Sequence, residues 1–176
     1  MILPTTYLGP ASWFQDFLRE PAIFEYNETF EKQTFRNRCL IRDAHGRVVR
    51  LTVPIAKVEH KQLTRDIRIS YQQHWQHQHW MALVSSYKHK PYFQYYADYL
   101  YPFYEQEIHY LIDFNEGLTQ VILSLLENKR PSAVRHGLFP TTQTWEGLVW
   151  TDNHPWQTEV SIIDSLFEHG PSTLLV

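Results

Sequence analysis

A short stretch near the N-terminus concentrates side chains that could bind an anion. Residues 25–41 read EYNETFEKQTFRNRCLI, so carboxylates, a lysine and two arginines follow closely on one another. If residues 35–42 form a strand, Arg36 and Arg38 point to one side of it, about 7 Å apart, and Asn37 points to the other. Two guanidinium groups at that spacing can hold a phosphate or a carboxylate through paired hydrogen bonds.

Other charged residues of this stretch could assist the two arginines. Lys32 adds a third positive charge just upstream. Glu25 and Glu28 could orient the cations, and Glu25 is the candidate general base if burial raises its pKa. The same residues also fit a solvated strand face on which alternating charges pair with each other. Both readings follow from the sequence.

A second cluster, HWQHQHW, interleaves three histidines with Trp75 and Trp80. On a helix, His74 and His77 share part of one face and His79 falls on the other side. Three ligands from this helix alone would not converge on a metal ion, so no metal site is predicted. His79, at the margin of an apolar stripe, is the candidate for a partly buried acid–base or hydrogen-bonding group. Exposed helix-surface histidines are the alternative.

The elements that must position these residues change in type along the chain. Strands are predicted at 2–8, 22–28 and 66–71, with a β-hairpin over 35–56 whose loop is DAHG. Helices are predicted at 11–20, about 73–90, 92–101, about 103–129 and 161–171. Ser161 is the predicted cap of the last helix and Gly170 its stop. This order favours an α/β fold, with α+β as the alternative: a small sheet from the N-terminal half and helices mainly in the C-terminal half.

Composition narrows the class of protein. With 176 residues, 43% of them hydrophobic and 20% charged, we expect one globular domain spanning 1–176. A net charge of -3 argues against a nucleic-acid partner. The one cysteine fits a reducing compartment, and neither a signal peptide nor a membrane span is predicted, so we expect a cytoplasmic protein. The common glycine-rich phosphate loops and the G-x-S-x-G nucleophile motif are missing from the sequence.

The order of these motifs resembles a known family. The segments TTYLGPASWF, FEKQTFRNRCLI, LTVPI, DIRISYQQHWQHQHWMALVSSYKHKPYFQYY, YLIDFNEGL and SIIDSLFEHGP occur in succession. Over nearly its whole length the chain is similar to the WbqC-like family of bacterial proteins. Its K-x-x-x-RNR element and its His-Trp pair match the family's polar motif, at Lys32, Arg36, Asn37, Arg38 and His79. Tyr7 and Pro10 match the opening element.

The resemblance implies a role more readily than a reaction. Some relatives are associated with bacterial surface-polysaccharide synthesis, in which amino sugars on nucleotide carriers are modified. The first hypothesis is therefore a transferase acting on a small anionic or sugar-like metabolite. Lys32, Arg36 and Arg38, with Asn37 beside them, would bind the anion, Glu25 or His79 would move a proton, and Tyr7, Trp75 and Trp80 would form an aromatic wall.

Two other hypotheses stay open at this point. The arginines and tryptophans could form the exposed surface of a non-enzymatic binding or assembly protein. Alternatively, the histidines could support a metal-dependent hydrolase. The sequence names no cofactor and no oligomeric state, and it does not decide whether the protein is an enzyme.

Overall fold

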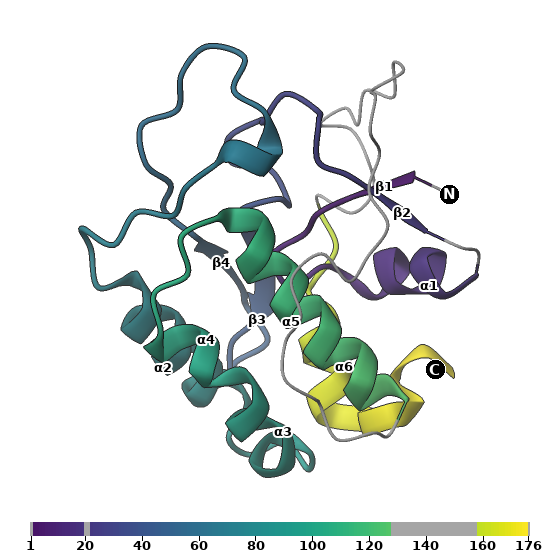
Figure 1. Ribbon diagram of the computed structural model, residues 1–176. Helices are drawn as coiled ribbons and strands as arrows, with labels where there is room; N and C mark the ends of the chain where they lie inside the picture. The colour runs from purple at the N-terminus through teal and green to yellow at the C-terminus, as the bar shows by residue number, and fades with distance from the viewer. Residues whose placement is uncertain (1, 20–21, 128–157, 176) are drawn as a thin grey trace.

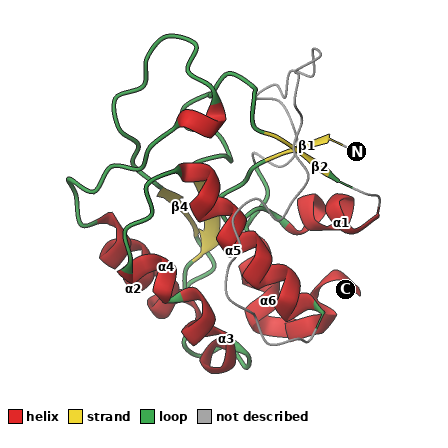
Figure 2. Cartoon of the chain, viewed as in Figure 1, coloured by secondary structure: helices red, strands yellow, loops and turns green. Residues whose placement is uncertain are grey.

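The structure is a computed structural model that describes residues 2–19, 22–127 and 158–175. Helices pack with two small β-sheets of two strands each, which confirms the predicted mixed α/β class (Figures 1 and 2). The strands are β1 (Ile2–Pro4), β2 (Ile23–Glu25), β3 (Arg38–Arg42) and β4 (Val48–Thr52). The α-helices are α1 (Ala11–Arg19), α2 (Trp75–Tyr87), α3 (Phe93–Leu100), α4 (Pro102–Glu105), α5 (Leu111–Leu126) and α6 (Ile162–His169), with 3-10 helices η1 (Thr64–Asp66) and η3 (Gly170–Leu175).

The chain opens with the predicted strand–helix–strand unit. β1 and β2 pair in parallel, with Leu3 opposite Phe24, and α1 connects them. The first strand is shorter than predicted and ends at Pro4, whose ring removes a backbone donor from the ladder. Beyond it the chain turns, and Leu8 adopts a left-handed φ of 46° that a strand cannot contain. This turn directs residues 7–10 toward the hairpin.

The β-hairpin is confirmed, and its turn is held by Asp43. β3 and β4 pair antiparallel from Arg38 opposite Thr52 to Arg42 opposite Val48. The Asp43 carboxylate accepts hydrogen bonds from the backbone N–H groups of His45 and Arg47. Gly46 has a φ of 78°, which glycine adopts without strain.

The predicted start of this hairpin is wrong. β3 begins at Arg38 rather than at residue 35, because the residues before it form a tight turn. The Asn37 side chain closes that turn by accepting a hydrogen bond from the Gln33 backbone N–H at 3.1 Å. Arg36 and Arg38 therefore do not share one strand face.

Two further boundaries differ from the predictions. Residues 66–71 form isolated bridges, from Ile69 to Ile55 and from Arg68 to Tyr110, because each residue pairs with a different segment. The predicted helix 103–129 is divided into α4 and α5, and the extended backbone of Gln106 follows α4. The end of that predicted helix lies outside the described residues.

The C-terminal helix forms as predicted. The Ser161 side chain caps α6 by accepting a hydrogen bond from the Ile163 N–H at 3.3 Å, and Gly170 ends it with a φ of 59°. α6 also covers the free edge of β3, since the Ser161 N–H donates to the Leu40 carbonyl at 2.7 Å. On the same edge, the Arg42 N–H donates to the Tyr87 hydroxyl.

Helix α5 crosses the middle of the molecule and carries the centre of the core (Figure 1). Its Phe114 is fully buried and its ring packs against those of Tyr7, Trp75 and Tyr104. Many of the aromatic residues that the composition shows thus fill the core. Within the described ranges, no helix combines the length and the apolar character needed to cross a membrane.

Candidate anion-binding site

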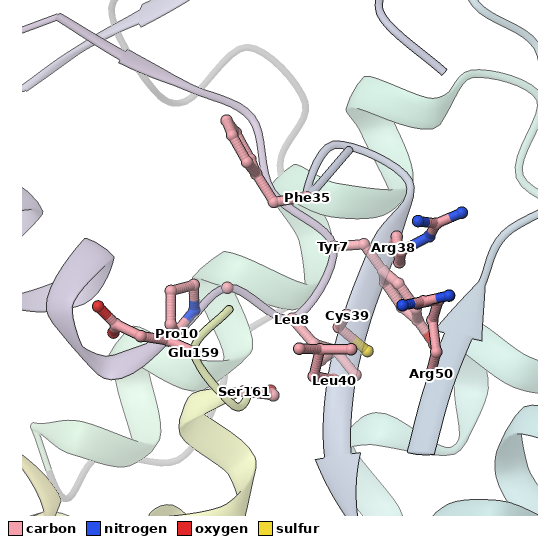
Figure 3. A pocket seen from close by; sticks show the side chains of 11 residues that line it. Tyr7, Leu8, Pro10, Phe35, Arg38, Cys39, Leu40, Arg50, Glu159 and Ser161 are labelled. Carbon is pink, nitrogen blue, oxygen red and sulfur yellow. The ribbon is translucent and has the colours of Figure 1, made fainter. Parts of the chain in front are cut away.

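A small pocket lies where the opening turn, the hairpin and the start of α6 meet (Figure 3). Its walls come from residues 7–10, from Phe35, from both strands of the hairpin and from Glu159 and Ser161. The cavity volume is about 50 Å³. Such a space suits one compact group of a ligand, such as a phosphate or a carboxylate, rather than a whole nucleotide sugar.

Two arginines of the hairpin supply the positive charge of this pocket. Arg38 lies opposite Thr52 and Arg50 lies opposite Leu40, so the arginines are diagonal neighbours on one face of the hairpin. Their guanidinium groups lie side by side in Figure 3. Partial burial, and then the charge of Arg50, lowers the pKa of Arg38.

Neither guanidinium is neutralised by the part of the chain that the structure describes. No carboxylate of residues 2–19, 22–127 or 158–175 lies within 4.0 Å of Arg38 or Arg50. Arg38 Nε makes a long hydrogen bond of 3.4 Å to Thr52 Oγ1. Two adjacent cations that repel each other favour an anion between them.

The opposite wall of the pocket contains a carboxylate. Ser12 Oγ donates a hydrogen bond of 2.5 Å to Glu159 Oε2, which holds the carboxylate beside the first turn of α1. The positive end of a helix dipole stabilises a negative charge there. In Figure 3 the Glu159 side chain points away from the two arginines. The arginine side of the pocket is therefore positive, and the carboxylate lies at the far end, bound to Ser12.

A buried hydrogen-bonded network lies behind the pocket. Tyr7 lines the pocket, and its hydroxyl lies 2.9 Å from His79 Nδ1 and 3.0 Å from the Tyr104 hydroxyl. Burial lowers the pKa of His79 to about 4, a shift that a hydrogen bond to the Thr52 backbone partly opposes. His79 is therefore neutral at pH 7. The neutral ring has one donor and one acceptor nitrogen, and its tautomer decides whether Nδ1 accepts from or donates to the Tyr7 hydroxyl.

The same burial acts on the phenols. Loss of solvent raises the pKa of Tyr7 well above its ordinary value, and the neighbouring Tyr104 adds to the rise. The pKa of Tyr104 is likewise raised, mainly by burial. At neutral pH the network therefore consists of uncharged groups that fix one another's orientation.

The two tryptophans enclose this network instead of lining the pocket. Trp75 is 2% exposed and packs edge-on against His79, with ring centres 5.1 Å apart. Trp80 packs against Tyr104 and Tyr101. Neither is among the residues that line the arginine pocket.

Arg36 is buried in an ion pair of its own. It is 1% exposed, its Nε and Nη2 donate to the two oxygens of Glu28 at 2.5 and 2.6 Å, and Nη1 donates to Thr34 Oγ1. Asn37 is also buried, and its amide donates to the Val53 carbonyl. These polar groups are bound within the chain itself, which shows why the opening stretch is so densely charged.

The remaining predicted residues lie outside the lining of the pocket. Lys32 is exposed on a turn. Glu25 ends β2, is 2% exposed and accepts a hydrogen bond of 2.6 Å from the Asn27 N–H. Of the predicted site residues, the structure thus brings Tyr7 and Arg38 to one hollow, with His79 one hydrogen bond behind Tyr7. The functional roles assigned to all nine residues stay predictions.

Two charged lining residues, Arg50 and Glu159, were not predicted from the sequence. The hairpin register could have identified Arg50, since the DAHG turn places it diagonally opposite Arg38. No local pattern singles out Glu159, which enters the site only through the docking of α6. No group of three or more histidine, cysteine or acidic residues with the geometry of a metal site occurs among the described residues.

Comparison with known proteins decides the family. A model described as the WbqC-like protein family matches residues 12–149. The chain belongs to the WbqC-like family. In this WbqC-like protein the matched range contains Arg38, Arg50 and His79, while Tyr7 and Glu159 lie outside it. Neither the curated proteins nor the solved structures include a match.

Proposed function

We propose that this WbqC-like protein binds a phosphate-bearing small metabolite, with its phosphate against Arg38 and Arg50. The observation that carries this proposal is the pair of adjacent guanidinium groups that no described carboxylate neutralises, at the wall of a pocket. A phosphate oxygen can accept hydrogen bonds from both side chains, and the fork of a guanidinium fits it well. The rest of the metabolite would extend from the open mouth.

We further propose that the protein is a transferase that modifies an amino sugar, in keeping with the role of some relatives in surface-polysaccharide synthesis. Glu159 is the carboxylate of the pocket lining, on the side opposite the arginines. With an activated acyl donor, the sugar amine would attack the acyl carbonyl, the donor's leaving group would depart with the bonding electron pair, and Glu159 would accept the amine proton. His79 reaches the pocket only through Tyr7, so we assign it a positioning role.

Titration with inorganic phosphate and with a uridine-diphosphate amino sugar tests the binding step. Both ligands should raise the melting temperature of the wild-type protein, and added salt should weaken the effect. Arg38→Gln and Arg50→Gln should each weaken binding about tenfold, because each removes a charge-assisted hydrogen bond. Arg19→Gln, which changes an exposed arginine on α1, is the matched control and should bind as the wild type does. Equal affinity in all four proteins would refute the site.

A transfer assay separates the enzyme from the non-enzymatic alternative. With the amino sugar and a panel of acyl donors, Glu159→Gln should reduce turnover while phosphate affinity is kept. Ligand binding without transfer for every donor would instead favour a binding protein. The alternative in which the tryptophans form an exposed partner surface gains no support from the buried position of Trp75.

A further inference from the structure

We propose a second ligand site, separate from the arginine pocket, that binds a neutral and hydroxyl-rich molecule such as a sugar ring. A cavity of about 280 Å³ lies where the turn of the hairpin, the C-terminal end of α2 and the first turn of α6 meet. Its volume approaches the lower end of the range of small-molecule sites, about 300 Å³. This site does not depend on the function proposed above.

The charges around the cavity cancel. Arg42 and Lys90 contribute positive charge, and Asp43 and Asp164 contribute negative charge, with His89 also in the lining. Lys90 is paired with Glu168, and Asp43 is paired with Arg47. Each of these charges has an opposite charge within 4.0 Å, so a bound ion of either sign would find no free counter-charge. The lining therefore selects against either sign and favours an uncharged ligand.

The same charges are suited to hydroxyl groups. A hydroxyl donates one hydrogen bond and accepts others, so it can lie between a carboxylate and a cation. Arg42 Nε and Asp164 Oδ2 are 3.7 Å apart, which is longer than a hydrogen bond and leaves bonding capacity on both. The Tyr87 hydroxyl donates to Asp164 and accepts from the Arg42 N–H, and so fixes these groups in place.

Ser86 places an unpaired hydroxyl at the wall of the cavity. It lines the cavity and is 9% exposed, and its hydroxyl makes no hydrogen bond within the described residues. Its neighbour Ser85, on the outer face of α2, satisfies its hydroxyl with the Ala82 carbonyl. The oxygen is not one of the fully buried atoms that lack a partner, so it is open to the cavity and can bond a ligand there.

Ligand-detected NMR with four methyl pyranosides tests this site: those of glucose, galactose, mannose and N-acetylglucosamine. At least one should bind wild-type protein saturably. Ser86→Leu should abolish that binding by filling the cavity, while Ser85→Leu, the matched control on the exposed face, should leave it unchanged. Asp164→Asn should weaken it about tenfold, because a hydrogen bond to a charged group is lost.

Phosphate titration of the same variants separates the two sites. Ser86→Leu should retain the wild-type affinity for inorganic phosphate, which also shows that the variant is folded. Absence of saturable binding by all four sugars, or equal sugar binding by Ser86→Leu and Ser85→Leu, would overturn the proposal. If Arg38→Gln loses phosphate binding but keeps sugar binding, the result supports a sugar site that is separate from the arginine pocket.

Discussion

The ion pair between Arg36 and Glu28 shows how a charged residue can be unavailable to a ligand. Both side chains are almost fully buried, and the guanidinium donates to both carboxylate oxygens. Pairing offsets the large cost of removing two charges from water. The backbone carbonyl of Arg36 also accepts from the Asn115 amide of α5, which ties this turn to the central helix.

Replacing Arg36 should therefore destabilise the fold rather than only reduce binding. Arg36→Ala leaves the Glu28 carboxylate buried without its cation and should lower the free energy of unfolding by about 3–5 kcal/mol. Urea denaturation measures the change. The double variant Glu28→Leu/Arg36→Met removes both charges and should recover most of the loss. A single variant as stable as the wild type would contradict this account.

His79 should make stability depend on pH. Its pKa falls from 6.5 in the unfolded chain to about 4 in the folded protein, so between these values the unfolded state binds more protons. The contribution is complete above pH 6.5 and is lost as the pH falls toward 4, by up to about 3 kcal/mol. Denaturant melts from pH 7 to 4 measure this slope. His79→Gln should have a shallower slope, and an unchanged slope would show that His79 is not its source.

At this scale the sequence predicted which types of residue occur near the pocket better than which of them are free to contact a ligand. Tyr7 and Arg38 lie at the pocket, and His79 lies behind it. Charge density alone could not reveal that Arg36 has a buried partner eight residues away. Glu159 could not be predicted because its place depends on how α6 docks, which is a tertiary contact.

At the scale of elements, turns and caps decided where the predictions succeeded. Ser161 caps the start of α6 and Gly170 stops it, as predicted, because both roles depend on local backbone geometry. The start of β3 was missed because the Asn37 side chain competes with strand pairing by holding a turn. That local hydrogen bond moves Arg36 off the strand and leaves Arg50 as the neighbour of Arg38.

The junction between α6 and η3 should tolerate only glycine. Gly170 has a φ of 59°, and a Cβ there would lie 2.5 Å from the Tyr92 ring. Gly170→Ala should lower the free energy of unfolding by at least about 2 kcal/mol, from backbone strain and this clash together. Thermal and urea denaturation measure it.

Gly46 supplies the control for that change. It also has a positive φ, of 78°, but no atom lies within 4 Å of the position that a Cβ would take there. Gly46→Ala should therefore show the backbone cost alone, about 1 kcal/mol. If the two variants lose equal stability, contact with Tyr92 contributes nothing.

For the whole molecule, the order of elements predicted the mixed class. The order of elements could not show which distant segments of the chain contact each other. The parallel pair β1–β2 and the hairpin β3–β4 remain separate sheets of two strands each, and α5 and the aromatic residues join them into one body. The pocket forms at a meeting point of residues 7–10, the hairpin and residues 159–161, so it exists only in the assembled fold.

The hydrogen bond from Ser161 to Leu40 has a consequence for biosynthesis. A ribosome completes the hairpin long before it adds residue 161. Until then, the Leu40 carbonyl lacks the hydrogen bond that the Ser161 N–H donates in the folded protein. During that interval the outer side of β3 can pair with a strand of a neighbouring nascent chain. Once the segment that contains Ser161 and α6 has been made and has folded, it covers this edge of β3. Newly made molecules should then no longer associate through it.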